Sequence, residues 1–78
     1  MKKDITPAQL RAARGLVDWT REQLADAAGT TVRTLARLER GETAPRLSTL
    51  CAIRSAFESV GVVFIPENGG GVGVRLKK

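Results

Sequence analysis

The sequence predicts a mainly α-helical domain, with about four short helices followed by a C-terminal β-hairpin. Two observations favour the helices: a capping signal for a helix start occurs twice, and apolar residues recur at helical spacing as far as Gly61. After Gly61, two β-favouring runs flank a glycine-rich segment, which predicts the hairpin. Because the 78 residues are only 42% hydrophobic, we expect one core and a single domain over residues 1–78.

The first helix is expected to begin directly after Thr6. Thr6 is a suitable N-cap, Pro7 suits the first helical position, and Gln9 can complete a capping box. We expect this helix to run through Arg14 and to end near Gly15, because glycine readily adopts the left-handed conformation that ends many helices.

A tight turn is predicted between the second and third helices. The second helix begins with the capping pair Thr20 and Gln23 and stops at Gly29, after only about two turns. Thr31 can cap the third helix, which is predicted over Val32–Arg40. A short helix held after such a turn can present its first residues to the major groove of DNA.

The fourth helix and the hairpin complete the chain. Apolar residues from Leu47 to Gly61 follow helical spacing, and we expect Cys51 on this helix to be buried. The hairpin strands are predicted at Val62–Ile65 and Val72–Leu76. Because a lone hairpin is only marginally stable, we expect it either to mediate homodimerisation or to pack on the fourth helix of its own chain.

Charge and composition favour a nucleic-acid partner and disfavour catalysis. Thirteen Lys and Arg against eight Asp and Glu give a net charge of +5, which suits a polyanion. With no histidine and one cysteine, we expect no metal site, no cofactor and no enzyme activity. No run of about 18 apolar residues occurs, so we expect no membrane association and a cytoplasmic location.

Three segments together carry a resemblance to a known family. Gln23–Ala25, Ala28–Thr31 and Thr34–Gly41 resemble the phage repressor and Cro family, also called the xenobiotic-response-element (XRE) family. The resemblance covers about residues 6–61. It implies a λ-repressor-like helix-turn-helix bundle that binds double-stranded DNA, with the hairpin outside the shared region.

The resemblance also implies roles for single residues. The start of the third helix would read base edges through Val32, Arg33, Thr34 and Arg37. Phosphates would be bound by Thr20, Gln23, Thr31, Arg40 and Arg46. A partly buried ion pair between Arg14 and Glu39 would join the first helix to the third. For Thr20, Gln23 and Thr31, helix capping alone is the alternative role.

Two residues depart from the pattern of the family. Arg46 stands where relatives often cap the fourth helix with Ser or Thr, which weakens the cap but adds charge near the DNA backbone. Asp18 replaces a common Gly before Trp19, so a left-handed conformation there would cost more.

The sequence thus predicts a transcriptional regulator, in particular a repressor that binds a pseudo-palindromic duplex site as a homodimer. The hairpin, within residues 62–78, is the expected dimerisation element, and residues 5–61 form the DNA-binding bundle. The alternative is an antitoxin-type interaction module that binds a toxin through the hairpin and DNA only for autoregulation.

Overall fold

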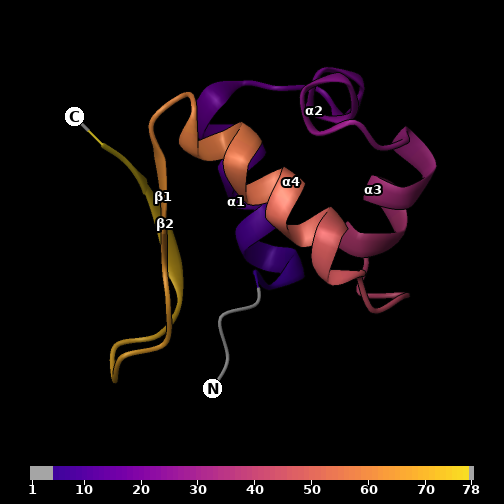
Figure 1. The fold of residues 1–78 in the computed structure, drawn as a ribbon. Helices are drawn as coiled ribbons and strands as arrows, with labels where there is room; N and C mark the ends of the chain where they lie inside the picture. The colour runs from indigo at the N-terminus through magenta and orange to yellow at the C-terminus, as the bar shows by residue number, and fades with distance from the viewer. Residues whose placement is uncertain (1–4, 78) are drawn as a thin grey trace.

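The computed structural model describes residues 5–77, and within that range the chain forms four helices and one antiparallel two-stranded sheet. The elements are α1 (Pro7–Val17), α2 (Arg21–Ala28), α3 (Val32–Glu39), α4 (Leu47–Glu58), β1 (Val62–Ile65) and β2 (Gly73–Leu76). The predicted helical bundle with a C-terminal hairpin is confirmed. Figure 1 shows the hairpin and α3 on opposite sides of the molecule, with α1 and α4 between them.

Two capping boxes begin α1 and α2, as the sequence predicts. At α1, Thr6 Oγ1 accepts a hydrogen bond from Gln9 N at 3.1 Å, and Thr6 N donates to Gln9 Oε1 at 2.9 Å. At α2, the same two bonds join Thr20 and Gln23 at 3.1 and 2.8 Å. Each box satisfies backbone N–H groups that a helix start otherwise leaves without partners.

The end of α1 differs from the prediction. The helix continues past Gly15 to Val17, and Asp18 takes the left-handed conformation with φ 57°. Trp19 N donates to Arg14 O at 3.0 Å, a local bond that closes the helix end. Val17 and Trp19, on either side of Asp18, pack against the core, so tertiary packing sets the point at which the chain turns. The cost anticipated for a non-glycine residue at position 18 is therefore present.

The end of α4 and the burial of Cys51 were also predicted wrongly. The helix stops at Glu58, and Val60 lies beyond it with 44% of its surface exposed. Cys51 is exposed, because residues two apart on a helix do not share a face and Ile53 points into the core. Sequence periodicity alone did not separate these two faces.

The core lies between the four helices and the inner face of the sheet. Its largest fully buried side chain is Phe57, whose ring stacks on Trp19 at 5.3 Å and meets Phe64 edge-on at 5.8 Å between ring centroids. These contacts join the α1–α2 turn, the last turn of α4 and β1. Trp19, directly before the α2 cap, therefore packs against the core.

The hairpin packs within its own chain through one face. Val62 and Phe64 on β1 are buried, and their cross-strand partners are Leu76 and Val74. β1 contacts α4, and β2 contacts α1. The sequence predicts packing of the hairpin on the fourth helix alone as one alternative, whereas in the structure it packs on both α4 and α1.

Gln9 ties the hairpin to the start of α1. Its side chain is buried, and Nε2 donates to Ile65 O at 3.1 Å and to Gly73 O at 2.9 Å. Its Oε1 is the acceptor in the α1 capping box. One amide group therefore caps a helix and holds both strands where they leave the sheet.

We expect Gln9→Ala to lower the free energy of unfolding by about 2–3 kcal/mol, because it removes the capping bond and two buried hydrogen bonds. Gln23→Ala is the matched control, since Gln23 makes the same capping box at an exposed position without contacting a strand. It should cost only about 1 kcal/mol. Urea denaturation measures both; equal losses would show that the bonds to the strands do not contribute.

Candidate nucleic-acid interface

The turn between α2 and α3 is short and internally bonded. Gly29 ends α2 with φ 68°, and Thr30 N donates to Ala25 O at 3.0 Å. Thr31 then caps α3, accepting from Thr34 N at 3.1 Å and sharing a hydroxyl hydrogen bond with Thr34 Oγ1 at 3.0 Å. Glycine suits the left-handed conformation, so the chain reverses here without strain.

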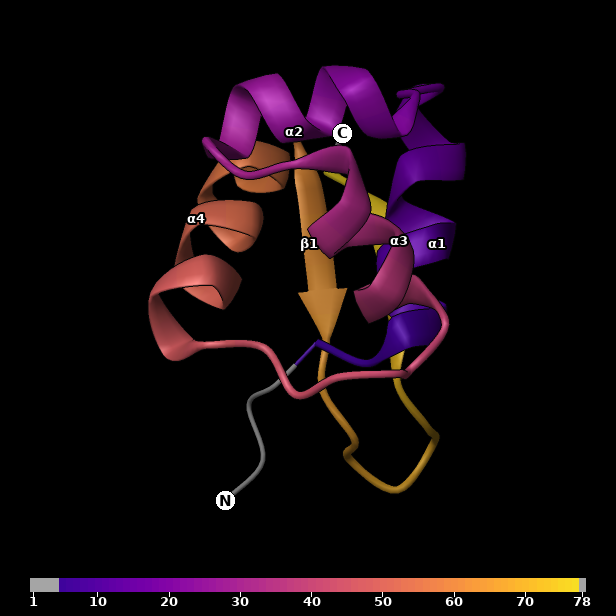
Figure 2. The same ribbon diagram turned by 90° about the vertical axis from the view of Figure 1, so that its right-hand side faces the viewer.

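α3 has one buried and one exposed side. Leu35 and Leu38 lie in the core, while Arg33 and Arg37 are exposed. Within residues 5–77, neither arginine side chain makes a hydrogen bond or an ion pair. Figure 2 shows α3 and α2 toward the viewer, with β1 behind them.

The remaining residues predicted at the start of α3 project less. Val32 and Thr34 are half-buried, and Val32 packs against the core. The Thr34 hydroxyl is bonded to Thr31. The structure therefore leaves Arg33 and Arg37 as the long side chains that extend from this helix.

The residues predicted to bind phosphate occupy helix ends and the loop after α3. Thr20 and Gln23 are exposed, but their capping box uses the Thr20 hydroxyl and the Gln23 carbonyl oxygen. Arg40 Nε contacts Glu42 Oε2 at 2.7 Å in an exposed ion pair, which lowers the pKa of Glu42. Arg46 is exposed at the N-cap of α4 and makes no capping bond, as its side chain predicts.

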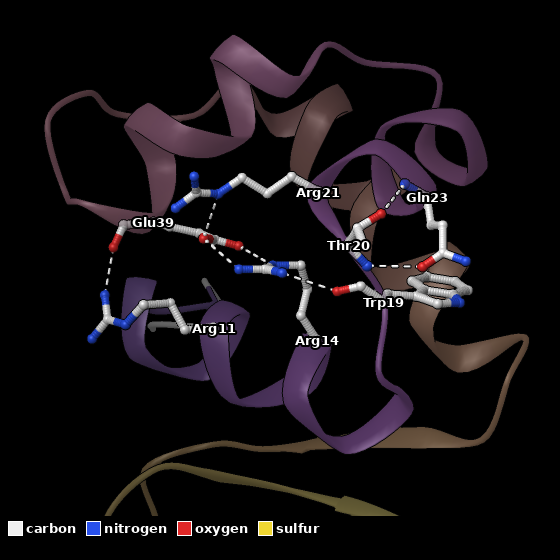
Figure 3. A network of polar contacts seen from close by, with 7 residues as sticks. All are labelled: Arg11, Arg14, Trp19, Thr20, Arg21, Gln23 and Glu39. Atoms are coloured by element: carbon white, nitrogen blue, oxygen red, sulfur yellow. Dashed lines mark hydrogen bonds and ion pairs between the residues drawn. The ribbon is translucent and has the colours of Figure 1, made fainter.

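A buried carboxylate fixes the end of α3. Glu39 is only 1% exposed, and its oxygens accept from Arg14 Nε at 2.6 Å and Arg14 Nη2 at 3.1 Å (Figure 3). The residues predicted to pair are therefore in direct contact. Arg14 Nη1 also donates to Trp19 O at 2.9 Å, so this guanidinium connects α1, the α1–α2 turn and α3.

Two further arginines join this cluster and were not expected from the sequence. Arg21 Nε donates to Glu39 Oε1 at 3.0 Å, and Arg11 donates to the Glu39 backbone carbonyl. Arg11 lies three residues before Arg14 on the same helix face, and that spacing is a signal that was available. No sequence pattern predicts the contact between Arg21 and Glu39, because it depends on how α2 crosses α3.

The arginines keep Glu39 ionised. Burial by itself would raise the pKa of its carboxyl group, but hydrogen bonds from Arg14 and Arg21 outweigh burial and hold the pKa below its ordinary value. The hydrogen bond between Arg14 and Glu39 also raises the pKa of Arg14. The cluster is thus a charged contact that holds α3 against α1 and α2.

A family model described as Helix-turn-helix (HTH_3, the XRE type) matches residues 10–64. The chain belongs to this helix-turn-helix family. Members of the XRE-type helix-turn-helix family are DNA-binding regulators, and the matched range contains α2, α3 and the Glu39 cluster. No curated protein matches the chain. Among residues 5–77, no helix is long and apolar enough to cross a membrane.

We expect the contribution of Glu39 to stability to be lost in acid. Because its folded-state pKa lies below its unfolded-state value of about 4.3, protons bind the unfolded chain first as the pH falls, and unfolding becomes easier. The gap in unfolding free energy between wild type and Glu39→Gln should therefore narrow from neutral pH toward pH 3.

Urea denaturation at several pH values measures this gap. Asp26→Asn is the control, because Asp26 is exposed on α2 and makes no ion pair with the described residues. It should retain the wild-type pH dependence. A gap between wild type and Glu39→Gln that stays constant with pH would contradict the assignment.

Proposed function

We propose that this regulator is a repressor that inserts α3 into the major groove and binds a short pseudo-palindromic site as a homodimer. The observation that carries the proposal is the pair Arg33 and Arg37. Both extend from a helix whose other side is buried, and neither guanidinium makes a hydrogen bond or an ion pair within the described range. A rigid helix with free guanidinium groups suits base recognition, because their fork can bind O6 and N7 of guanine.

The residues around α3 supply the rest of the proposed interface. Val32 and Thr34 lie close to the base edges and make smaller contacts, such as one between Val32 and a thymine methyl group. Proposed phosphate contacts come from Thr20, Gln23, Thr31, Arg40 and Arg46. Phosphate contacts set the position of α3 on the duplex, whereas base contacts select the sequence.

The position of the hairpin restricts how a homodimer can form. A contact between the outer faces of two hairpins would turn the two α3 helices away from each other, because the hairpin lies opposite α3 (Figure 1). Pairing along strand edges keeps both helices on one side of the dimer. To read two successive major grooves, both α3 helices must lie on one side of the dimer, about 34 Å apart.

We assign the dimer contact to the edge of β2. The inward side chains of β1 are buried, whereas on β2 Val74 is only half-buried and Leu76 is 46% exposed. β2 therefore leaves apolar surface that a second copy can cover. A contact between identical edges is also isologous and produces the two-fold axis that a pseudo-palindromic site needs.

We expect Arg33→Ala and Arg37→Ala each to cost about 1–3 kcal/mol on the preferred site and to relax its sequence preference. Arg46→Ala is the control, because loss of a phosphate contact should weaken all duplexes alike and reduce the salt slope by about 1. Selection from a random duplex pool, followed by titrations against selected and scrambled DNA, measures these effects. If both α3 variants keep the full affinity ratio, the assigned residues do not read bases.

We expect the full chain to sediment as a dimer and Leu76→Pro to sediment as a monomer. Lys77 N donates to Gly61 O, and in an antiparallel pair successive N–H groups alternate between the partner strand and the open edge. The N–H of Leu76 therefore points away from β1, to the open edge of β2. Proline at this position removes no bond between β1 and β2. Val63→Lys, on the outer face, is the control and should stay dimeric. A monomeric wild type, or a dimeric Leu76→Pro, would contradict the edge contact.

Removing the hairpin is a poor test of dimerisation. Val62 is 1% exposed and Phe64 is 8% exposed, so both belong to the core. A chain that ends at Gly61 should lose stability before it loses a subunit contact, because deletion of large core side chains costs several kcal/mol. A point change on the edge separates the two effects.

A further inference from the structure

An apolar cavity of about 950 Å³ opens where α1 and α4 begin and the hairpin turns. Its walls are mainly aliphatic and aromatic and include Ile5, Leu10, Leu38, Leu50, Ile53 and Phe64. The volume lies within the range of small-molecule sites, which are about 300–1,000 Å³ and mostly apolar. The proposed DNA interface does not use this space.

The amide and the charged groups in the walls already have partners within the protein. The Gln9 amide is bonded to Thr6 N and to two strand carbonyls. The Glu67 carboxylate accepts from Gly69 N at 3.1 Å and from Gly71 N at 3.2 Å. The Arg54 guanidinium lies over the Phe64 ring and contacts Glu58. A charged ligand would find no unpaired counter-charge here, so the walls favour a neutral, apolar molecule.

A small molecule fits this cavity better than a second copy of the chain. Filling a concave apolar volume from another protein needs a projecting apolar segment. In the described part of the chain, the large exposed apolar side chains are scattered along it: Leu16, Leu47, Val60, Val72 and Leu76. Two of them, Leu47 and Val72, line this cavity themselves.

The cavity also reaches the proposed recognition helix. Leu38 forms part of its wall and follows Arg37 directly on α3. Gly41, Thr43 and Pro45, in the loop between α3 and α4, line it as well. A molecule in the cavity would therefore contact the buried side of the helix whose exposed side carries the basic residues.

We propose that this cavity binds one uncharged, apolar small molecule and that its occupation changes the affinity of the protein for duplex DNA. The second half of the proposal rests on the proposed function. The first half does not, because binding to the cavity can be measured without DNA. By linkage, DNA must change the affinity for the small molecule by the same factor.

The neutral fluorophore N-phenyl-1-naphthylamine can test the cavity in the full chain without DNA. We expect saturable binding of one probe per chain and at least a tenfold loss of affinity in Cys51→Trp, whose indole would enter the cavity. Ser55→Trp is the matched control, because Ser55 is exposed on α4 and does not line the cavity. It should bind the probe as wild type does.

Alkylation of Cys51 gives a second readout that needs no variant. Cys51 is exposed, lines the cavity and is the one cysteine of the chain. Saturating probe should slow its reaction with iodoacetamide severalfold. Unchanged alkylation, absent saturation, or equal probe binding by both tryptophan variants would overturn the site.

Other occupants would give other results. One probe per two chains, with a shift in the monomer–dimer equilibrium, would make the cavity a contact between copies and overturn the proposal. Probe binding that appears only after residues 1–4 are deleted would assign the space to the chain's own N-terminal segment, which also overturns it.

The regulatory half needs duplex DNA from the selection described above. We expect saturating probe to change the affinity for that duplex at least fivefold, with an equal reciprocal change in probe affinity. Probe binding without this change would overturn the coupling. Absence of all duplex binding would overturn the proposed function, while the probe titration would still report on the cavity.

Discussion

The helix-turn-helix depends on one buried negative charge. The Glu39 carboxylate is held by Arg14 from α1 and Arg21 from α2, and its backbone carbonyl accepts from Arg11. A buried ion that loses a partner commonly costs about 3–5 kcal/mol, so this carboxylate is stable only when the helices meet correctly. The orientation of α3 relative to α1 and α2 is therefore set by electrostatics as well as by the apolar contacts of Leu35 and Leu38.

This arrangement explains how such a short helix can stand at the surface. α3 spans Val32–Glu39 and would be unstable alone in water, since isolated helices of this length are marginal. Thr31 accepts from the N–H of Thr34 at its start, and the Glu39 cluster anchors its end. With both ends fixed, the arginines between them are presented on a rigid support, which reduces the entropy lost on binding.

Much of the fold follows from local signals in the sequence. Capping boxes at Thr6 and Thr20 predict two helix starts, and Gly29 predicts the tight turn, because these residues act on their own backbone. The end of α1 could not be predicted in this way, since it depends on the packing of Val17 and Trp19. Local sequence signals do not contain that information.

The candidate site shows the same division. The pairing of Arg14 with Glu39 was expected from the family pattern, and the structure brings the two together. Arg21 was missed, because its contact depends on the crossing of two helices. Gln9 was recognised only as a cap, although its amide nitrogen reaches two strands more than fifty residues away. Long-range roles of this kind become visible only once the hairpin is placed against α1.

Asp18 has a consequence for how the sequence can change. Its left-handed backbone holds strain that glycine would not hold, and its negative charge lies at the unfavourable C-terminal end of α1. Replacing Asp18 with glycine would therefore raise the free energy of unfolding of the domain. Because most new side chains reduce stability, such a reserve would allow more of them to be accepted on α3. The turn before Trp19 can thus influence how readily the protein acquires new DNA targets during evolution.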